Sequence, residues 1–191
     1  MSARAYRVNE IFYSLQGEGF WTGTPTVFVR LSGCNLHCPF CDTDHSAFTE
    51  MTADGIVAAV KSCGGVCRRI CLTGGEPALQ ADEALISAFH AAGYTVHMET
   101  NGTRELPEGI DWVTMSPKLG GPVVLEKADE LKLVLTAGVD PKDWASFPAQ
   151  WHFLQPCDHH GRTNVAEVTA YIEAHPSWRL SLQTHKLLGI R

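Results

Sequence analysis

The sequence lacks the features of exported, membrane-bound and nucleic-acid-binding proteins. Residues 1–11 carry charges with no apolar stretch behind them, and no apolar run reaches the roughly 18 residues that would span a bilayer. The formal net charge of -6 gives no general electrostatic attraction to nucleic acid or to anionic lipid. We therefore expect a cytoplasmic protein that acts on a small molecule, with neither nucleic acid nor membrane as a partner.

The sequence also has no repeat, no low-complexity tract and no long linker within its 191 residues. Because 45% of the residues are hydrophobic, the chain can bury one core, and we expect a single domain over 1–191. Cysteine, in contrast, is plentiful at 7 residues, and two closely spaced triplets account for all but one of them. Because this differs from the disulfide framework of a small secreted domain, it indicates metal binding in a reducing compartment.

Short apolar or β-branched runs predict strands, and helical patterns lie between several of them. The strands are expected at 27–31, 69–73, 95–99, 112–116, 131–135, 151–155 and 179–183. The helices are expected at 52–62, 82–92 and 165–175, and two of them open near a threonine or aspartate cap. Strands that alternate with helices predict a parallel sheet.

Some connections leave no room for a crossover helix. The segment 102–109, for example, is too short and too rich in glycine and proline. The expected fold class is therefore α/β, an open partial (β/α) barrel with reduced helix content. Polar segments follow four of the predicted strands, at 74–76, 100–101, 116–118 and 156–158. Since ligands bind beyond the carboxyl ends of parallel strands, these segments should share one face.

The first cysteine triplet has the spacing of an iron–sulfur site. Cys34, Cys38 and Cys41 form C-x3-C-x2-C in a loop after the first strong predicted strand. Four-iron clusters normally take four cysteine ligands, so a compact group of three leaves one iron free to bind another molecule. A structural zinc loop is the alternative, and it would need His37 or His45 as a fourth ligand.

This triplet resembles that of the radical S-adenosylmethionine (SAM) superfamily, in which the unique iron chelates the amino and carboxylate groups of SAM. The segment TGGEP at 73–77 looks like the superfamily's GGE motif. Its glycines let backbone approach a ligand, and Glu76 can accept a hydrogen bond from the SAM amino group. The resemblance implies a 4Fe-4S cluster on the triplet and SAM as cofactor. The SAM contacts that it implies are Gly75, Glu76, Glu99, Asn101, Ser116, Pro117, Lys118, Gln155, Pro156, Cys157 and Asp158.

Within that superfamily, the whole chain resembles the 7-carboxy-7-deazaguanine synthase family. The resemblance rests on FYSLQGEG at 12–19, Arg30, CDT at 41–43, TGGEP at 73–77, SPK at 116–118, QP at 155–156 and QTHK at 183–186. Members of this family are homodimers that convert 6-carboxy-5,6,7,8-tetrahydropterin into 7-carboxy-7-deazaguanine with loss of ammonia, a step towards queuosine. The resemblance therefore implies a carbon–nitrogen lyase that takes electrons from a flavodoxin- or ferredoxin-type reductant.

The same resemblance assigns a substrate site and a magnesium ion. The implied substrate contacts are Leu15, Gln16, Gly17, Glu18, Arg30, Thr73, His185 and the α-carboxylate of Arg191. Thr43 is the implied Mg²⁺ ligand, although its hydroxyl has the alternative role of tying down the cluster loop. Arg30 has the alternative role of a structural ion pair, and a frayed tail is the alternative for the end of the chain.

Other candidate groups carry weaker signals. Cys63, Cys67 and Cys71 would share one face of a continuous helix, but glycines at 64–65 break the helix and Cys71 belongs to a predicted strand. We expect these three to diverge and to form no second cluster. Cys157 is expected to pack rather than to act as a nucleophile, and the pair of histidines at 159–160 is expected to be solvated.

Two other functions are compatible with parts of this pattern. A radical SAM activase that makes a glycyl radical on a partner protein would also have a short, open barrel. Gln16, Glu18 and Arg30 favour a small polar heterocycle over a protein substrate. A non-enzymatic iron–sulfur or zinc module would need no SAM pocket at all.

Overall fold

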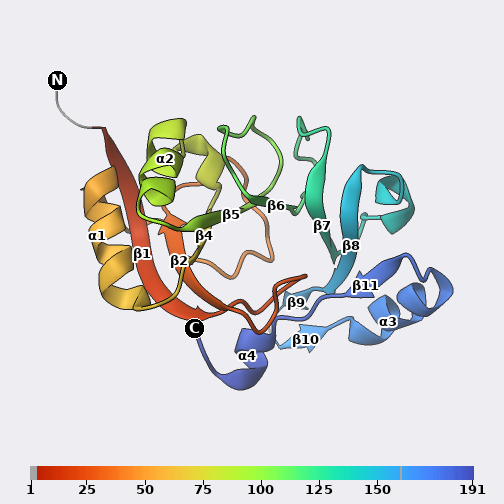
Figure 1. Ribbon diagram of the computed structural model, residues 1–191. Coiled ribbons are helices and arrows are strands. Elements are labelled where there is room, and N and C mark those ends of the chain that lie inside the picture. Colours follow the sequence, from red (N-terminus) through yellow and green to blue (C-terminus); the bar gives the residue numbers. More distant parts are fainter. Residues whose placement is uncertain (1–3, 160) are drawn as a thin grey trace.

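A computed structural model describes residues 4–159 and 161–191 (Figure 1). The strands of its main sheet are β1 Ala5–Leu15, β2 Pro25–Leu31, β3 Thr49–Thr52, β4 Arg69–Gly74, β5 Thr95–Thr100, β6 Trp112–Met115, β7 Ala128–Leu135, β8 Ala149–Pro156 and β11 Trp178–Leu180. A small hairpin contains β9 Asp158–His159 and β10 Arg162–Thr163. The α-helices are α1 Ala53–Gly64, α2 Glu83–Ala91, α3 Val165–Ala174 and α4 Thr184–Leu188, and the 3-10 helices are η1 Pro77–Leu79 and η2 Pro141–Trp144.

The main sheet is mixed and open. Its strand order is β11-β8-β7-β6-β5-β4-β2-β1-β3, and neighbours from β2 to β11 run parallel. The sheet therefore has two free edges, β11 and β3, which confirms the predicted open partial barrel of the α/β class. The purely parallel expectation is wrong at one end, because β1 pairs antiparallel with both β2 and β3.

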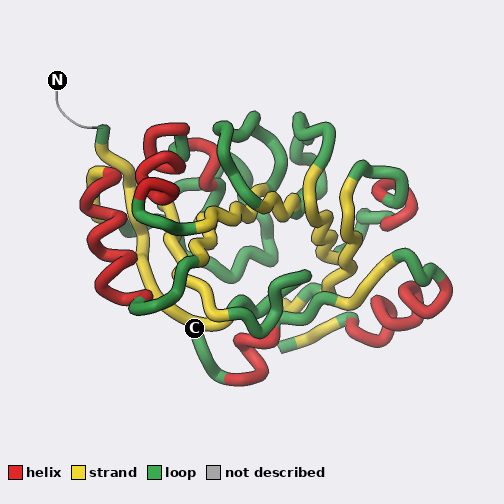
Figure 2. Tube along the Cα trace, in the orientation of Figure 1, coloured by secondary structure: helices red, strands yellow, loops and turns green. Residues whose placement is uncertain are grey.

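The helices cover the outside of the curved sheet (Figure 2). Helices α1 and α2 pack over one part of the sheet, around Ile56, Leu85 and Phe89, while α3 packs over the other part through Val168. Thr52 and Asp82 cap α1 and α2 as predicted, because their side chains accept hydrogen bonds from the first-turn amides. The segment 102–109 contains no helix, which also agrees with the prediction.

Side chains alternate between the outer core and the interior of the barrel. In β7, Leu131 and Leu133 are buried in the outer core, whereas Lys132 and Val134 line an inner cavity. In β2, Val29 belongs to the outer core. This alternation follows from the two-residue period of a strand. It gives the sheet an apolar outer face under the helices and an inner face that lines the cavity.

The last predicted strand is too long. It was expected at 179–183, but β11 ends at Leu180 and the chain then turns into α4. Ser181 follows the strand: its amide still donates to the Leu154 carbonyl, and its hydroxyl donates to Gln155 Oε1 at 2.7 Å. None of the helices in residues 4–159 and 161–191 combines the length and the apolar character that a membrane crossing requires.

Candidate active site

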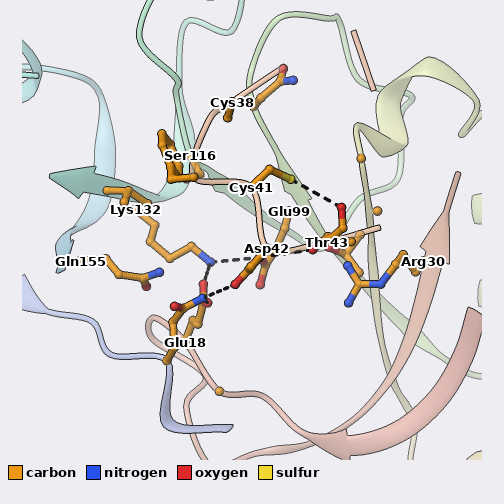
Figure 3. A pocket seen from close by; sticks show the side chains of 18 of the residues that line it. Glu18, Arg30, Cys38, Cys41, Asp42, Thr43, Glu99, Ser116, Lys132 and Gln155 are labelled. Carbon is orange, nitrogen blue, oxygen red and sulfur yellow. Dashed lines mark hydrogen bonds and ion pairs between the residues drawn. The ribbon is translucent and has the colours of Figure 1, made fainter. Parts of the chain in front are cut away.

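A cavity of about 280 Å³ opens at the carboxyl ends of the parallel strands (Figure 3). The cysteine loop, the N-terminal segment and the end of the chain complete its wall. The predicted site residues that line it are Leu15, Gln16, Gly17, Glu18, Arg30, Cys34, Cys38, Cys41, Thr43, Thr73, Gly75, Glu99, Asn101, Ser116, Lys118, Gln155, Pro156, Cys157, Asp158, His185 and Arg191. The strand-end segments expected on one face thus meet around one pocket.

Glu76 and Pro117 are the predicted site residues that do not line this pocket. The carboxylate of Glu76 is buried and accepts hydrogen bonds from Thr100 Oγ1 at 2.7 Å and from the amides of Asn101 and Ala78 at 2.6 and 3.0 Å. Burial raises its pKa, although these donors oppose the shift. Glu76 therefore ties the end of β4 to the end of β5, and its contact with SAM stays a prediction.

The three cysteines lie on a loop that is closed at its base. Ser32 Oγ and the Gly33 amide both donate to the carbonyl of His45, at 2.5 and 3.2 Å. Among the residues that the structure describes, no three His, Cys, Asp or Glu side chains are grouped to hold a single metal ion. A cuboidal cluster binds each thiolate through a different iron, so it needs wider sulfur spacing than one tetrahedral ion does. The described residues therefore do not present the close ligand group of a structural zinc ion, and a cluster on these three thiolates stays a prediction.

The glycine motif after β4 supports the cysteine loop directly. The Glu76 amide donates to the Gly33 carbonyl at 2.9 Å. A Cβ atom on Gly75 would lie 2.3 Å from the Gly33 carbonyl oxygen and 2.7 Å from Cys34 Cβ. Only glycine fits at this position without displacing the loop, so the motif and the first cysteine form one structural unit.

We therefore expect Gly75→Ala to displace the cysteine loop and to lower the iron bound per chain after anaerobic reconstitution. Overpacking of this kind costs about 1–3 kcal/mol of stability. Gly55→Ala is the matched control: its added Cβ would meet its nearest neighbour, Thr52 Oγ1, at an ordinary 3.4 Å. Equal iron content in the two variants would contradict the close approach of Gly75 to the loop.

A chain of charged and polar groups crosses the pocket. Lys132 Nζ contacts Glu18 Oε2 at 2.5 Å and Glu99 Oε2 at 3.1 Å. Gln16 Nε2 donates to the other oxygen of Glu99 at 2.9 Å, and Gln183 Nε2 donates to the other oxygen of Glu18 at 2.9 Å. All five residues line the cavity. Neither Lys132 nor Gln183 is among the site residues predicted from the sequence.

The electrostatics of this polar network favour the charged form of Glu18 and disfavour that of Lys118. Burial would raise the pKa of Glu18, but the charge and hydrogen bond of Lys132 and the hydrogen bond of Gln183 hold it below its usual value. Lys118 is another cationic residue of the pocket, and it donates to the carbonyl and the hydroxyl of Ser116 at 2.5 and 2.7 Å. Burial and the nearby charge of Lys132 lower the pKa of Lys118 to about 8.

The end of the chain is docked rather than frayed. Ser14 Oγ donates to the terminal residue's carbonyl oxygen at 2.6 Å, and the guanidinium of Arg191 pairs with Glu10. Glu10 also pairs with Arg30 Nε at 2.8 Å, so the structural ion pair considered for Arg30 is present. Arg30 and Arg191 nevertheless both line the pocket.

The second cysteine triplet diverges as expected. Cys63 is exposed on α1, Cys67 lies in the following loop with its thiol near the Pro25 carbonyl at 3.4 Å, and Cys71 is buried on β4. Burial raises the pKa of the Cys71 thiol well above its usual value. Cys157 is partly buried at the cavity wall, and its packing role stays a prediction. Of the two histidines, His160 lies outside the described residues.

Comparison with known proteins agrees with this geometry. The model of the radical SAM superfamily matches residues 28–134, which include the cysteine loop and the glycine motif. A 7-carboxy-7-deazaguanine synthase of Bacteroides thetaiotaomicron is 54% identical over 185 residues, covering 97% of this chain and 98% of that protein. The enzyme of the same name from Bordetella pertussis is 44% identical over 210 aligned positions, covering 97% and 99%. The crystal structure of QueE from Escherichia coli superimposes with a TM-score of 0.77 and 28% identity, over 93% of each chain.

The fold, the cysteine loop and the superfamily match together define a radical SAM enzyme, whose family uses a 4Fe-4S cluster and SAM. Within that superfamily, the chain belongs to the 7-carboxy-7-deazaguanine synthase family. This confirms the resemblance on which the sequence analysis relies. The relatives do not favour the glycyl-radical activase.

Proposed function

We propose that the chain converts 6-carboxy-5,6,7,8-tetrahydropterin into 7-carboxy-7-deazaguanine with loss of ammonia, in queuosine biosynthesis. Its family supports this activity. The main support for the proposal is that the cysteine loop and the polar network around Lys132, Glu18 and Glu99 line the same cavity. The cluster and SAM, when bound, supply the one-electron reduction and the hydrogen abstraction that begin the ring contraction.

The residues of the cavity suit a carboxylated pterin. The edge of a pterin ring presents both N–H donors and carbonyl acceptors, which carboxylates and the amide of Gln16 can bind. Glu18 and Glu99 supply the carboxylates in the cavity wall. Because Glu10 takes only the Nε edge of Arg30, the terminal nitrogens of that guanidinium remain for the substrate carboxylate.

Anaerobic reconstitution with iron and sulfide, followed by SAM, a reductant and the carboxylated tetrahydropterin, tests the proposal. Mass spectrometry should detect 7-carboxy-7-deazaguanine, and release of ammonia should match its amount. Omission of SAM is the control and should give no product. Cleavage of SAM with the pterin left unchanged would show that the substrate is another molecule.

We also propose that Mg²⁺ assists the reaction and that Thr43 is its protein ligand. Thr43 lies at the cavity wall with its hydroxyl 3.4 Å from Asp42 Oδ1, which makes this an oxygen-rich part of the site. Mg²⁺ prefers oxygen ligands and commonly takes few of them from the protein. A bound substrate would complete the ligand set through its own oxygens.

Thr43→Ala is expected to keep the iron content and SAM binding while raising the Mg²⁺ concentration for half-maximal turnover by about 10-fold or more. The titration of turnover with MgCl2 measures this shift. Thr169→Ala, on the exposed face of α3, is the control because that hydroxyl bonds only to backbone of its own helix. An unchanged magnesium response in the Thr43 variant would return this threonine to a structural role.

We further propose that residues 1–191 work as one domain in a cytoplasmic homodimer served by a flavodoxin- or ferredoxin-type reductant. The main sheet supplies the parallel strands around the cavity, which supports a single domain. Tyr13, Leu187 and Leu188 are exposed apolar side chains, and they supply a surface for a second copy.

The cysteines support the proposed reductant and compartment. Cys41 is exposed, so a reductant can approach that side of the cluster loop. All 7 cysteines are free, which suits a reducing compartment.

A further inference from the structure

Lys132 occupies an unusual position for a lysine. It projects from β7 into the barrel, its side chain is only 4% exposed, and its ammonium reaches two carboxylates from different elements (Figure 3). Glu99 comes from β5, and Glu18 comes from the segment that follows β1. A buried lysine is rare unless it is paired, so two anionic partners account for its burial.

The two carboxylates depend on this one cation. Among the residues that the structure describes, no other lysine or arginine forms an ion pair with Glu18 or Glu99. The Nε atom of Arg30 pairs with Glu10 rather than with either carboxylate, and Lys118 is bonded to Ser116. Without Lys132, two negative groups would face one another across a partly desolvated cavity.

The remaining oxygens of both carboxylates are also held. Gln183 donates to Glu18 Oε1, and Gln16 donates to Glu99 Oε1, each at 2.9 Å. These amides are weaker donors than the ammonium and can exchange for N–H groups of a ligand. The Lys132 ammonium therefore fixes one oxygen of each carboxylate. The other oxygen, Oε1 of Glu18 and of Glu99, is bonded to an amide that a ligand can displace.

We propose that Lys132 is a positioning residue for the pterin ring. It holds Glu18 and Glu99 at a fixed separation, so that their remaining oxygens accept hydrogen bonds from the N–H groups along the edge of the pterin in place of those from Gln183 and Gln16. This inference rests on the proposed function and adds to it a residue that acts on the substrate through two others. Lys132 is expected to affect binding of the pterin more than assembly of the cluster.

Steady-state kinetics of Lys132→Met test the proposal, because methionine has a similar length and no charge. We expect the KM for 6-carboxy-5,6,7,8-tetrahydropterin to rise by about 10-fold or more, with a smaller change in kcat and with unchanged iron per chain. Lys142→Met is the matched control, since Lys142 is exposed on η2 and away from the cavity. A wild-type KM in the Lys132 variant would overturn the proposal.

A double-mutant cycle separates positioning from general support of the fold. If Lys132 acts through Glu18, the effect of Lys132→Met on KM should be smaller by about 5-fold or more in a Glu18→Gln background. Effects that simply multiply would overturn the proposal. Lys132→Arg, which keeps the charge, should restore part of the affinity that Lys132→Met loses.

A second pair of variants covers the case in which Lys132→Met does not fold. Lys132→Gln keeps a donor without the charge, and Lys132→Arg keeps both, so the arginine variant should have the lower KM. Equal KM values, or loss of folding in all three variants, would overturn the proposal in favour of a structural lysine. Failure of the wild-type enzyme to consume the pterin would instead contradict the proposed function, whatever the variants show.

Discussion

Cys34→Ala, Cys38→Ala and Cys41→Ala are each expected to abolish both cluster assembly and turnover. Each substitution removes one of three thiolates that hold a cluster with an open iron, and two remaining thiolates leave half of the irons without a protein ligand. Iron and sulfide per chain, the visible absorbance of the reconstituted protein and formation of product measure the loss. All three cysteines lie at the same cavity wall.

The second triplet supplies the matched control for this prediction. Cys63→Ala and Cys67→Ala should leave the iron content unchanged, because Cys63 points to solvent from α1 and the Cys67 thiol lies near the backbone carbonyls of Pro25 and Arg69. Neither thiol lines the cavity. Loss of a whole cluster's iron in the Cys63 variant would mean that the chain carries a second iron–sulfur site.

The parallel part of the barrel could be predicted because its strands carry a strong apolar signal. Runs such as 69–73 and 131–135 are buried on their outer face and begin or end near glycine or polar residues, so their existence and order follow from the sequence. Strand β1 carries Arg7, Asn9 and Glu10 among its apolar residues, which hides its period. β3 has only four residues, too few to show one.

Site residues that belong to a recognisable motif could be predicted, whereas Lys132, which lies inside β7 and in no such motif, could not. Ser116 and Gln155 were found through the motifs that contain them. Lys132 stands in a run of leucines, where a lone charge is easily taken for an edge position. The alternation of Glu130 and Lys132 with Leu131 and Leu133 is nevertheless a usable signal, because polar residues at every second position predict a second, polar face.

Contacts between segments that are far apart in the chain could not be predicted from the sequence. Glu76 was assigned to SAM by its motif, yet its carboxylate bonds to residues 24 and 25 positions further on, at the end of β5. Such a partner depends on which strand ends are neighbours. The docking of the last residues on β1 likewise depends on the turn at Ser181 and on α4. Gly189, the residue after α4, caps the helix in a left-handed conformation with φ of 64°.

The position of the chain terminus leads to the second large expected effect. Figure 1 places the C-terminus beside β1, where Ser14 Oγ donates to the carbonyl oxygen of Arg191 at 2.6 Å. Arg191 and His185 both line the cavity, and the amide of Ile190 donates to the carbonyl of His185, so the tail is bonded to the last helix. We propose that the α-carboxylate of Arg191, when free, accepts a hydrogen bond from the bound substrate.

An affinity tag after Arg191 is therefore expected to cut turnover by about 10- to 100-fold, while the same tag before Met1 should not. The tag converts the terminal carboxylate into a neutral peptide group, and a hydrogen bond to a charged group contributes about 1.5–3 kcal/mol. Iron content and SAM binding should survive in both tagged proteins, since the cluster loop is untouched.

Arg191→Ala without a tag separates the role of the terminal carboxylate from that of the Arg191 side chain. This variant keeps the carboxylate and removes the ion pair with Glu10, so it should lose less activity than the enzyme tagged after Arg191. Equal activity of the two tagged forms would show that the terminal carboxylate has no part in turnover.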